Sequence, residues 1–186
     1  MFIKKIIFFL IFIILSRFLY SHPHLFIKTS VEAVISEGVA KGIKINWEWD
    51  KWWSEDVINQ CDKDGNGIFS DSEIKLIYDD FFIGIKDFNF FTELFVNDKK
   101  IKISKVLQFS ADVKKDKLVS YNFIIPTDEK IGEILKIKIG FNDETIYTSF
   151  DKNIFLKKDK NFNYSGVSLN EKGYYGAEII FNLSKK

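Results

Sequence analysis

The chain has 186 residues and a formal net charge of +1, and 46% of its residues are apolar and 17% aromatic. That length allows one domain plus a short targeting segment, and a chain this apolar can bury a full core, which excludes a disordered protein. The near-neutral charge excludes the basic excess of a nucleic-acid-binding protein, and the single cysteine, Cys61, excludes an intrachain disulfide framework.

The first 21 residues have the pattern of a secretory signal peptide. Residues 1–5 contain two lysines, residues 6–15 form an unbroken apolar run, and a cleavage point follows Ser21. The run is shorter than the roughly 20 apolar residues of a membrane-spanning helix, although an uncleaved anchor that extends to Tyr20 is an alternative. The pattern predicts a periplasmic or secreted protein that begins at His22 and has no stable membrane span after cleavage.

Residues 22–186 are expected to form a single β-rich domain. Residues 25–35 and 39–49 alternate apolar and polar side chains on either side of a turn that contains Gly38. This pattern predicts a β-hairpin.

A helix–loop–helix insert is expected within this domain at about residues 51–82. Apolar residues recur at four-residue spacing in residues 52–61, and residues 74–81 carry them at positions i, i+3, i+4 and i+7. Both patterns are typical of helices with one buried face.

The strand period returns after the insert. The expected strands are residues 94–96, 99–103, 106–113, 118–125, 134–141, 145–150 and 174–183. Asn-Asp pairs at 97–98 and 142–143 mark turns, and the charged residues 157–160 are expected to form a solvated loop. Closely spaced strands with short turns predict a mostly β (α+β) fold, an antiparallel β-sandwich-like domain with an inserted EF-hand-type helix–loop–helix.

Residues 62–73 fit the calcium-loop pattern D-x-[DN]-x-[DN]-G-x₅-E without a gap. Ca²⁺ prefers about six to eight oxygen ligands, and alternate residues of a tightly wound loop can supply them. Gly67 permits the sharp turn because it lacks a Cβ. The expected Ca²⁺ ligands are five side chains and the backbone carbonyl of Ile68, namely Asp62, Asp64, Asn66, Ile68, Ser70 and Glu73.

A simpler interpretation of this segment needs no metal. Residues 70–73 are also a helix capping box, and Asp, Asn and Gly are common in turns. These facts do not explain why Asp62, Asp64 and Gly67 all fall in register with Glu73. The chain has one such loop and no methionine besides Met1, so a structural Ca²⁺ is expected rather than a sensor that opens a Met-rich groove.

Both histidines of the chain lie at the expected mature N-terminus, in the sequence His22-Pro23-His24. The free α-amine and two imidazoles make a candidate site for Zn²⁺, Ni²⁺ or Cu²⁺. Pro23 has no N–H, so the deprotonated amide of that residue cannot wrap such a metal. The alternative is that these residues are only a polar start to the first strand.

An enzymatic function is not expected. A Ser-His-Asp or Cys-His arrangement would need a histidine base, and the chain has none beyond residues 22–24. A hydrolase that uses two carboxylates in a cleft is an alternative. Trp47, Trp49, Trp52 and Trp53 could offer a sugar-stacking platform, but alternation along a strand favours core packing. Exposed, coplanar Trp rings would favour carbohydrate binding, and buried rings would argue against it.

The His-Pro-His start, the segment Trp47-Glu48-Trp49-Asp50, the loop at 62–73 and the segment at 90–94 together resemble a family of periplasmic proteins of unknown function. That family is catalogued as the periplasmic component of an uncharacterised ABC-type transport system, and its members are often encoded beside nickel, cobalt or zinc transporters. The resemblance implies a non-enzymatic accessory in transition-metal transport or handling, with an inner-membrane metal transporter as partner and His22 and His24 as ligands. A calcium-stabilised adhesion or carbohydrate-binding module is the alternative.

Overall fold

Two long strands begin the described part of the protein, and buried side chains alternate with more exposed ones along most of their length. A computed structural model describes residues 25–143, 145 and 147–186. Strands β1 (Leu25–Ser36) and β2 (Val39–Trp49) form the expected antiparallel hairpin. Gly38 adopts a φ of +73° in the turn, a conformation that costs a residue with a side chain more.

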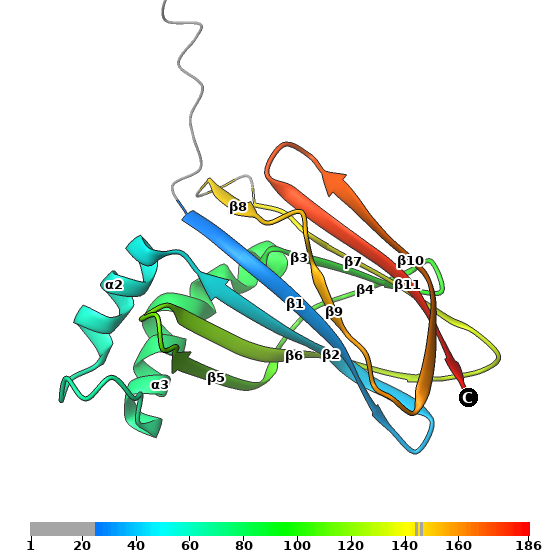
Figure 1. Cartoon of the computed structure of the whole chain (residues 1–186), viewed down its shortest axis with the longest axis horizontal. Helices are drawn as coiled ribbons and strands as arrows, with labels where there is room; N and C mark the ends of the chain where they lie inside the picture. Colours follow the sequence, from blue (N-terminus) through cyan, green and yellow to red (C-terminus); the bar gives the residue numbers. More distant parts are fainter. Residues whose placement is uncertain (1–24, 144, 146) are drawn as a thin grey trace, which may run out of the picture.

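The hairpin lies within the larger of two sheets (Figure 1). The order in this sheet is β5-β6-β2-β1-β8, and β9 also pairs with β1. The other strands of this sheet are β5 (Leu107–Val113), β6 (Val119–Lys130), β8 (Thr148–Phe150) and β9 (Phe155–Lys157). The pairs of β1 with β8 and β9 are parallel, whereas the other pairs are antiparallel, as expected.

The second sheet is antiparallel throughout and has the order β10-β11-β7-β3-β4. Its strands are β3 (Thr92–Val96), β4 (Lys99–Ile101), β7 (Leu135–Phe141), β10 (Phe162–Lys172) and β11 (Gly176–Lys185). The fold is therefore mostly β, with largely antiparallel sheets, as the sequence predicts.

The hydrophobic core lies between the two sheets. Trp47 on β2 is fully buried, and its ring contacts Phe141 on β7 of the opposite sheet at a centroid distance of 6.4 Å. Trp49 is also buried, and it stacks on Trp53 at 4.9 Å. The alternating Trp residues of β2 thus pack inside the protein.

A helical segment follows β2 and covers one side of the larger sheet (Figure 1). It contains α2 (Lys51–Cys61), α3 (Asp71–Ile77), the π-helix η1 (Tyr78–Phe82) and the 3₁₀ segment η2 (Ile83–Phe91). Asp50 caps α2, because its carboxylate accepts a hydrogen bond from the Trp53 N–H at 3.0 Å. Phe82 is fully buried and joins the segment to the core through Phe123, at a ring distance of 5.1 Å.

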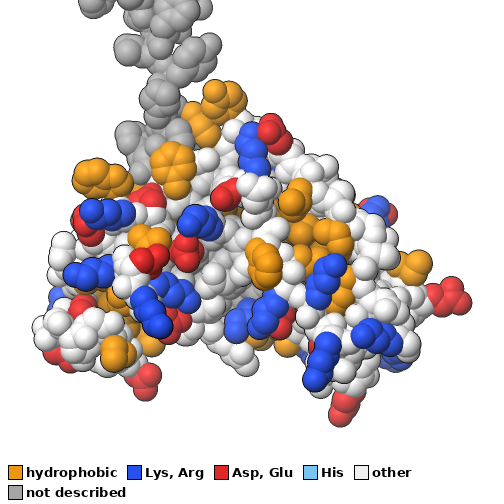
Figure 2. Space-filling model, in the orientation of Figure 1, with side chains coloured by type: hydrophobic (Ala, Val, Ile, Leu, Met, Phe, Trp, Pro, Cys, Tyr) orange, Lys and Arg blue, Asp and Glu red, His pale blue; other side chains and the backbone are white. Residues whose placement is uncertain are grey.

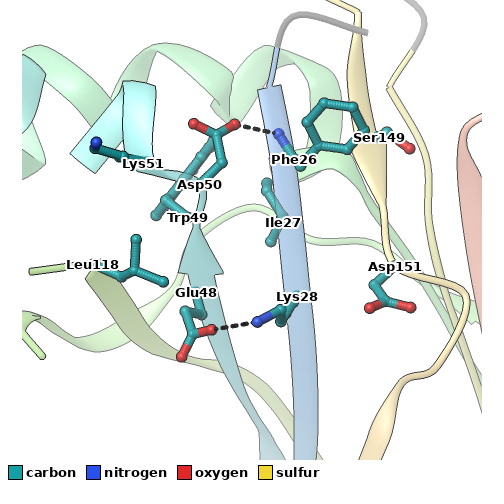
Figure 3. Close-up of a pocket in the computed structure, with 10 residues that line it drawn as sticks. All are labelled: Phe26, Ile27, Lys28, Glu48, Trp49, Asp50, Lys51, Leu118, Ser149 and Asp151. Atoms are coloured by element: carbon teal, nitrogen blue, oxygen red, sulfur yellow. Dashed lines mark hydrogen bonds and ion pairs between the residues drawn. The ribbon is translucent and has the colours of Figure 1, made fainter. Parts of the chain in front are cut away.

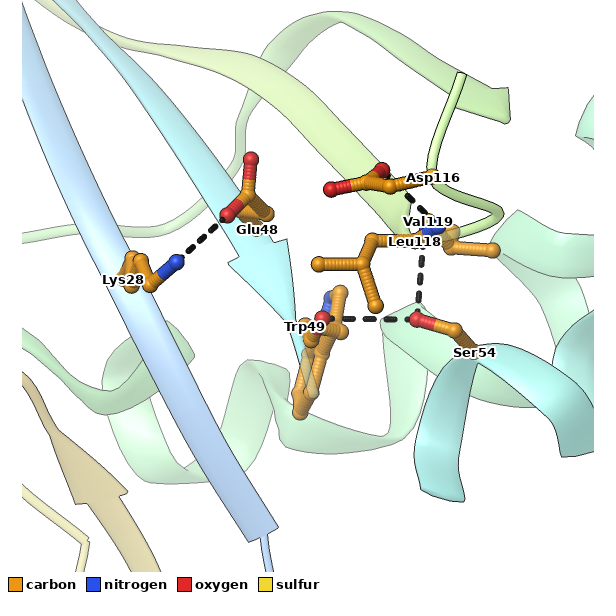
Figure 4. Close-up of polar contacts among 7 residues, drawn as sticks. All are labelled: Lys28, Glu48, Trp49, Ser54, Asp116, Leu118 and Val119. Atoms are coloured by element: carbon orange, nitrogen blue, oxygen red, sulfur yellow. Dashed lines mark hydrogen bonds and ion pairs between the residues drawn. The ribbon is translucent and has the colours of Figure 1, made fainter. Parts of the chain in front are cut away.

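A buried hydroxyl fixes α2 to the sheet (Figure 4). The Ser54 Oγ donates to the Trp49 carbonyl at 3.3 Å and accepts from the Val119 N–H at 2.8 Å. Ser54 has no solvent exposure. One side chain therefore forms hydrogen bonds with backbone groups at the end of β2 and at the start of β6, and these bonds hold the helix in place.

Replacing Ser54 by Ala is expected to destabilise the protein by about 1–3 kcal/mol, because the Val119 N–H would stay buried without its acceptor. Urea denaturation followed by circular dichroism measures this loss. Ser72→Ala is a suitable control, since Ser72 is exposed on α3, and we expect it to change the free energy of unfolding by less than about 0.5 kcal/mol. Equal stability of Ser54→Ala and the parent would contradict the assignment.

Several boundaries differ from the sequence prediction. Strands β9 and β10 were not among the expected strands. Lys157, the first residue of the expected solvated loop at 157–160, instead ends β9 and forms an ion pair with Glu32 at 2.9 Å. The expected strand at 145–150 is shorter, since β8 begins at Thr148. The second helix of the insert becomes a π-helix at Tyr78 and continues as 3₁₀ turns to Phe91. The expected signal peptide at residues 1–21 lies outside the described residues.

Candidate metal centre

The loop between α2 and α3 begins where α2 ends. Asp62 is the C-cap of α2, and Ser70 is the N-cap of α3. Gly65 and Gly67 have φ values of +70° and +76°, so the chain turns sharply twice within three residues. The two helices therefore hold both ends of a tightly wound loop.

Three carboxylates converge in this loop. Oxygen atoms of Asp62, Asp64 and Glu73 all lie within 4.8 Å of one another. Among the described residues, these make up the one group of three or more potential metal-binding side chains with this convergence. Carboxylate oxygens that converge in this way could hold a hard cation, which prefers oxygen ligands.

Hydrogen bonds within the loop hold these carboxylates in place. Asp62 accepts from the Gly67 N–H at 2.9 Å and from the Asn66 N–H at 3.2 Å. Asp64 accepts from the Asn66 side-chain amide at 2.7 Å, and the Asn66 Oδ1 accepts from the Ile68 N–H at 2.7 Å. The side chains of residues 62, 64 and 66 are thus turned inward by the backbone of the loop itself.

Glu73 closes the loop from the first turn of α3. One of its oxygens accepts from the Lys63 N–H at 2.6 Å, and the other accepts from the N–H and hydroxyl of Ser70, both at 2.8 Å. Hydrogen bonds from Ser70, led by its backbone N–H, hold the pKa of Glu73 below its ordinary value. The side chain is buried, with 6% exposure, yet stays charged at neutral pH.

The capping box expected from the sequence is present as well. It uses Ser70 and Glu73 but leaves the approach of Asp62 and Asp64 unexplained. None of the ion pairs found in the described part of the chain involves these three carboxylates. Their mutual repulsion, about 1 kcal/mol per pair even at the dielectric constant of water, is therefore not relieved by a salt bridge.

The neighbours of the carboxylates have distinct positions. The Ile68 side chain points outward and is 72% exposed, so only its backbone carbonyl is available to the site. Phe69 is buried and joins the core cluster, which anchors the loop to the domain. Cys61 is fully buried, and burial raises the pKa of its thiol, so it packs beneath the helix as expected.

The other candidate site residues, His22 and His24, lie outside the described residues. Trp47 and Trp49, which an exposed sugar platform would need, are buried in the core. Trp52 is exposed, but its neighbour Trp53 is half-buried against Trp49. The tryptophans therefore do not form a coplanar exposed surface.

A cleft of about 490 Å³ opens on the outer face of the larger sheet, beside the start of β1 (Figure 3). Its acidic side chains already have partners. Asp50 accepts from the Phe26 N–H at 2.6 Å, Glu48 pairs with Lys28 at 3.1 Å, and Asp151 accepts from the N–H of Asn153 at 2.8 Å. This cleft has the apolar walls of a binding surface but not the convergent oxygens of a metal site.

Comparison with known proteins gives a family without an assigned activity. The family model described as "Protein of unknown function (DUF1007)" matches residues 7–164. An uncharacterised 15.5 kDa protein of Spirochaeta aurantia, from the trpE 3′ region, is 28% identical over 92 residues. That alignment covers 50% of this chain and 65% of the relative, slightly less than two thirds of its length. No solved structure matches the chain.

The sequence pattern does not reveal the groups that support the loop and the helix before it. The Lys63 N–H, which binds Glu73, and the Ser54 hydroxyl, which fixes α2, have no sequence pattern that marks them. They are backbone and small polar groups whose partners become close only after the chain folds. The carboxylates themselves carry the recognisable spacing.

Proposed function

The chain belongs to the DUF1007 family of proteins of unknown function, and we propose that it is an exported protein that binds one Ca²⁺ in an EF-hand-type loop at residues 62–73. The observation that carries the proposal is the approach of Asp62, Asp64 and Glu73 to within 4.8 Å without a salt-bridge partner among the described residues. Asn66, the Ile68 carbonyl and Ser70 would complete the oxygen ligands.

The residues fit Ca²⁺ better than a softer metal. The loop offers carboxylate, amide, carbonyl and hydroxyl oxygens, and no sulfur or imidazole is among the expected ligands. The bound ion would neutralise three close negative charges and link α2 to α3. The expected role is structural, and the proposal assigns no enzymatic activity.

Calorimetric titration of Ca²⁺ into the chelator-treated protein tests the site directly. We expect one binding event with a dissociation constant on the order of 10⁻⁴–10⁻³ M, as in extracellular modules, and weaker binding of Mg²⁺, which demands a smaller octahedral site. Asp62→Asn removes a negative charge and one of the two oxygens that accept from the loop backbone, so the affinity should fall by roughly tenfold. The absence of a heat of Ca²⁺ binding in the parent protein would contradict the proposal.

A wider role follows from the resemblance to periplasmic transport proteins. We propose a non-enzymatic accessory in transition-metal transport or handling, with His22 and His24 as ligands for Zn²⁺, Ni²⁺ or Cu²⁺ and an inner-membrane metal transporter as partner. Only the sequence His22-Pro23-His24 and the family resemblance support this role. Titration of Zn²⁺ and Cu²⁺ tests it, because replacing both histidines by Ala should abolish binding, and unchanged affinity would rule out the site.

A further inference from the structure

Strand β10 is the longest edge strand in the described part of the chain. It has 11 residues and pairs with β11 alone among the described strands. The edge strands β4, β8 and β9 have 3 residues each. The remaining edge strand, β5, lies beside the helical segment, where its Phe109 ring contacts Tyr78 at 5.2 Å and Phe82 at 4.5 Å (Figure 1). The outer side of β10 therefore offers the longest row of backbone groups for pairing with another strand.

The middle of β10 lacks the charges that usually protect an edge strand. Natural edge strands often carry Lys or Pro, which discourage pairing with another chain. Residues 163–170 contain no charged residue and no proline. Val167 is 44% exposed and Leu169 is 46% exposed. Figure 2 shows apolar side chains at the surface over β9, β10 and β11, on the right of the view. The composition of β10 therefore permits pairing with a further strand.

Both halves of β10 are fixed to the domain. In the first half, the Tyr164 ring packs on Phe181 of β11 at a centroid distance of 5.9 Å. At the other end, Lys172 forms an ion pair with Glu93 on β3. The Lys172 side chain passes over Gly140 on β7, where a Cβ would lie 2.8 Å from the Lys172 Cδ. An edge that is already held in this way loses little conformational entropy when another strand pairs with it.

The bulge in β10 puts apolar side chains on the same face in both halves of the strand. The register with β11 shifts between Ser165 and Ser168, so β10 carries an extra residue there. Tyr164 before the bulge and Leu169 after it are both opposite fully buried residues of β11, which places both on the core side of the sheet. In a strand without a bulge, residues an odd number of positions apart face opposite sides. The two halves of β10 can therefore meet face to face in an antiparallel pair.

We propose that two copies of the chain form a dimer by antiparallel pairing of β10 with β10 about a two-fold axis between Ser165 and Gly166. Both copies carry the bulge at this axis, so the extra residue of one is matched by that of the other. The axis makes the interface isologous, and each cross-strand pair occurs twice. The pairs between the copies are Tyr164 with Val167 and Phe162 with Leu169 on the core side, and Asn163 with Ser168 on the outer side.

The charges that flank these pairs favour this register. It places Lys160 opposite Glu171 of the second copy, and opposite charges across a strand pair are favourable. Glu171 pairs with Lys152 at 2.5 Å, whereas none of the ion pairs found in the described residues includes Lys160. A slip of one residue would put Lys160 opposite Lys172 or, in the other direction, Asp159 opposite Glu171. Either slip would also turn the apolar side chains to opposite faces.

Sedimentation equilibrium of the purified mature protein tests the dimer. About eight residues a side is less than a standard interface, so we expect a weak dimer whose mass rises toward twice that of one chain between about 1 µM and 1 mM. Leu169→Lys puts a charge in the middle of the pairing and should stay monomeric. Leu107→Lys, at a leucine of β5 that is 41% exposed, should associate as the parent does. A parent that stays monomeric throughout, or a Leu169→Lys variant that associates equally well, would overturn the proposal.

Disulfide formation between two single-substitution variants tests the register. Asn163 and Ser168 are both exposed, and as cross-strand partners their Cα atoms would be about 4.5–5.5 Å apart, which a disulfide can span. A mixture of Asn163→Cys and Ser168→Cys should therefore form a linked dimer under mild oxidation. Either variant alone should not, because its two cysteines would be about 17 Å apart along the strands.

Two controls accompany this experiment. The native Cys61 is fully buried and is present in every sample, so the parent protein measures its contribution. Near-ultraviolet circular dichroism checks that both variants keep the parent fold. Linkage in the mixture that is no greater than in either variant alone would overturn the proposal, and none of these outcomes bears on Ca²⁺ binding.

Discussion

Replacing Glu73 by Gln is expected to remove the Ca²⁺-dependent rise in the melting temperature of the protein. Gln keeps the length of the side chain and an oxygen that can accept from Ser70, so the capping box survives. It loses the negative charge and the bidentate carboxylate that would close the Ca²⁺ site. The variant should therefore still fold without Ca²⁺, at a lower melting temperature than the parent because the hydrogen bond from the Lys63 N–H is lost, but it should no longer respond to the ion.

The size of the effect follows from mass action. At a Ca²⁺ concentration about 100 times the dissociation constant, binding stabilises the folded state by about 2.7 kcal/mol. For a domain of this size, this corresponds to a rise of roughly 5–10 °C in the melting temperature of the parent. Differential scanning calorimetry with excess Ca²⁺ and with a chelator measures the shift in both proteins.

Asp71→Asn is the matched control for this experiment. Asp71 is also acidic and lies in the first turn of α3, but it is exposed and does not belong to the converging group. Its replacement lowers the local charge and a favourable interaction with the helix dipole, worth about 0.3–1 kcal/mol, without removing a ligand. It should keep the Ca²⁺ response. If the parent melts at the same temperature in Ca²⁺ and in chelator, residues 62–73 form only a turn.

The strands that the sequence predicts well are those with one fully buried face. Along β2, the residues from Ile43 to Trp49 alternate strictly, because every second side chain faces the opposite sheet. Strand β10 escapes prediction for the opposite reason. It lies at an edge, most of its side chains are exposed, and the register shifts between Ser165 and Ser168 around Gly166, which has a φ of +59°. A shift of this kind breaks the period of two.

Parallel pairing at the start of β1 could not be predicted from local pattern. Strands β8 and β9 have three residues each, which is too short for a period to be recognised. Their position depends on contacts with residues more than a hundred positions earlier, such as Leu25 opposite Thr148. The helical insert shows a related limit, since the apolar spacing predicts the first turns of α3 but not the change to π and 3₁₀ geometry that brings Phe82 and Phe90 into the core.

The residues of the candidate site are easier to predict from sequence than the contacts that surround them. Ligands from one short segment carry their geometry in their spacing, so the grouping of Asp62, Asp64 and Glu73 follows the sequence pattern. The Ser54 hydroxyl has no such spacing, because its partners, the Trp49 carbonyl and the Val119 N–H, come from separate places in the chain. Contacts assembled in this way require the structure.

The largest expected loss of stability is at Trp47. This side chain has no solvent exposure, and it connects both sheets and the helical segment. Its ring contacts are with Trp49, Phe82, Phe123, Phe141 and Phe150, at centroid distances of 4.9 to 6.4 Å. Trp47→Ala should therefore cost about 3–5 kcal/mol of the free energy of unfolding, because the cavity lies where three layers meet and none can collapse into it alone.

Two further variants separate this cavity effect from loss of the indole N–H. The Trp47 Nε1 is buried and has no hydrogen-bond partner in the part of the chain that the structure describes, so Trp47→Phe removes a poorly satisfied polar group and keeps most of the ring volume. We expect Trp47→Phe to cost less than about 1.5 kcal/mol. Trp52→Ala, which truncates a 78% exposed ring, should change stability by less than about 0.5 kcal/mol. Urea denaturation should rank the three in this order, and a Trp47→Ala variant as stable as Trp52→Ala would show that the two sheets do not pack through this ring.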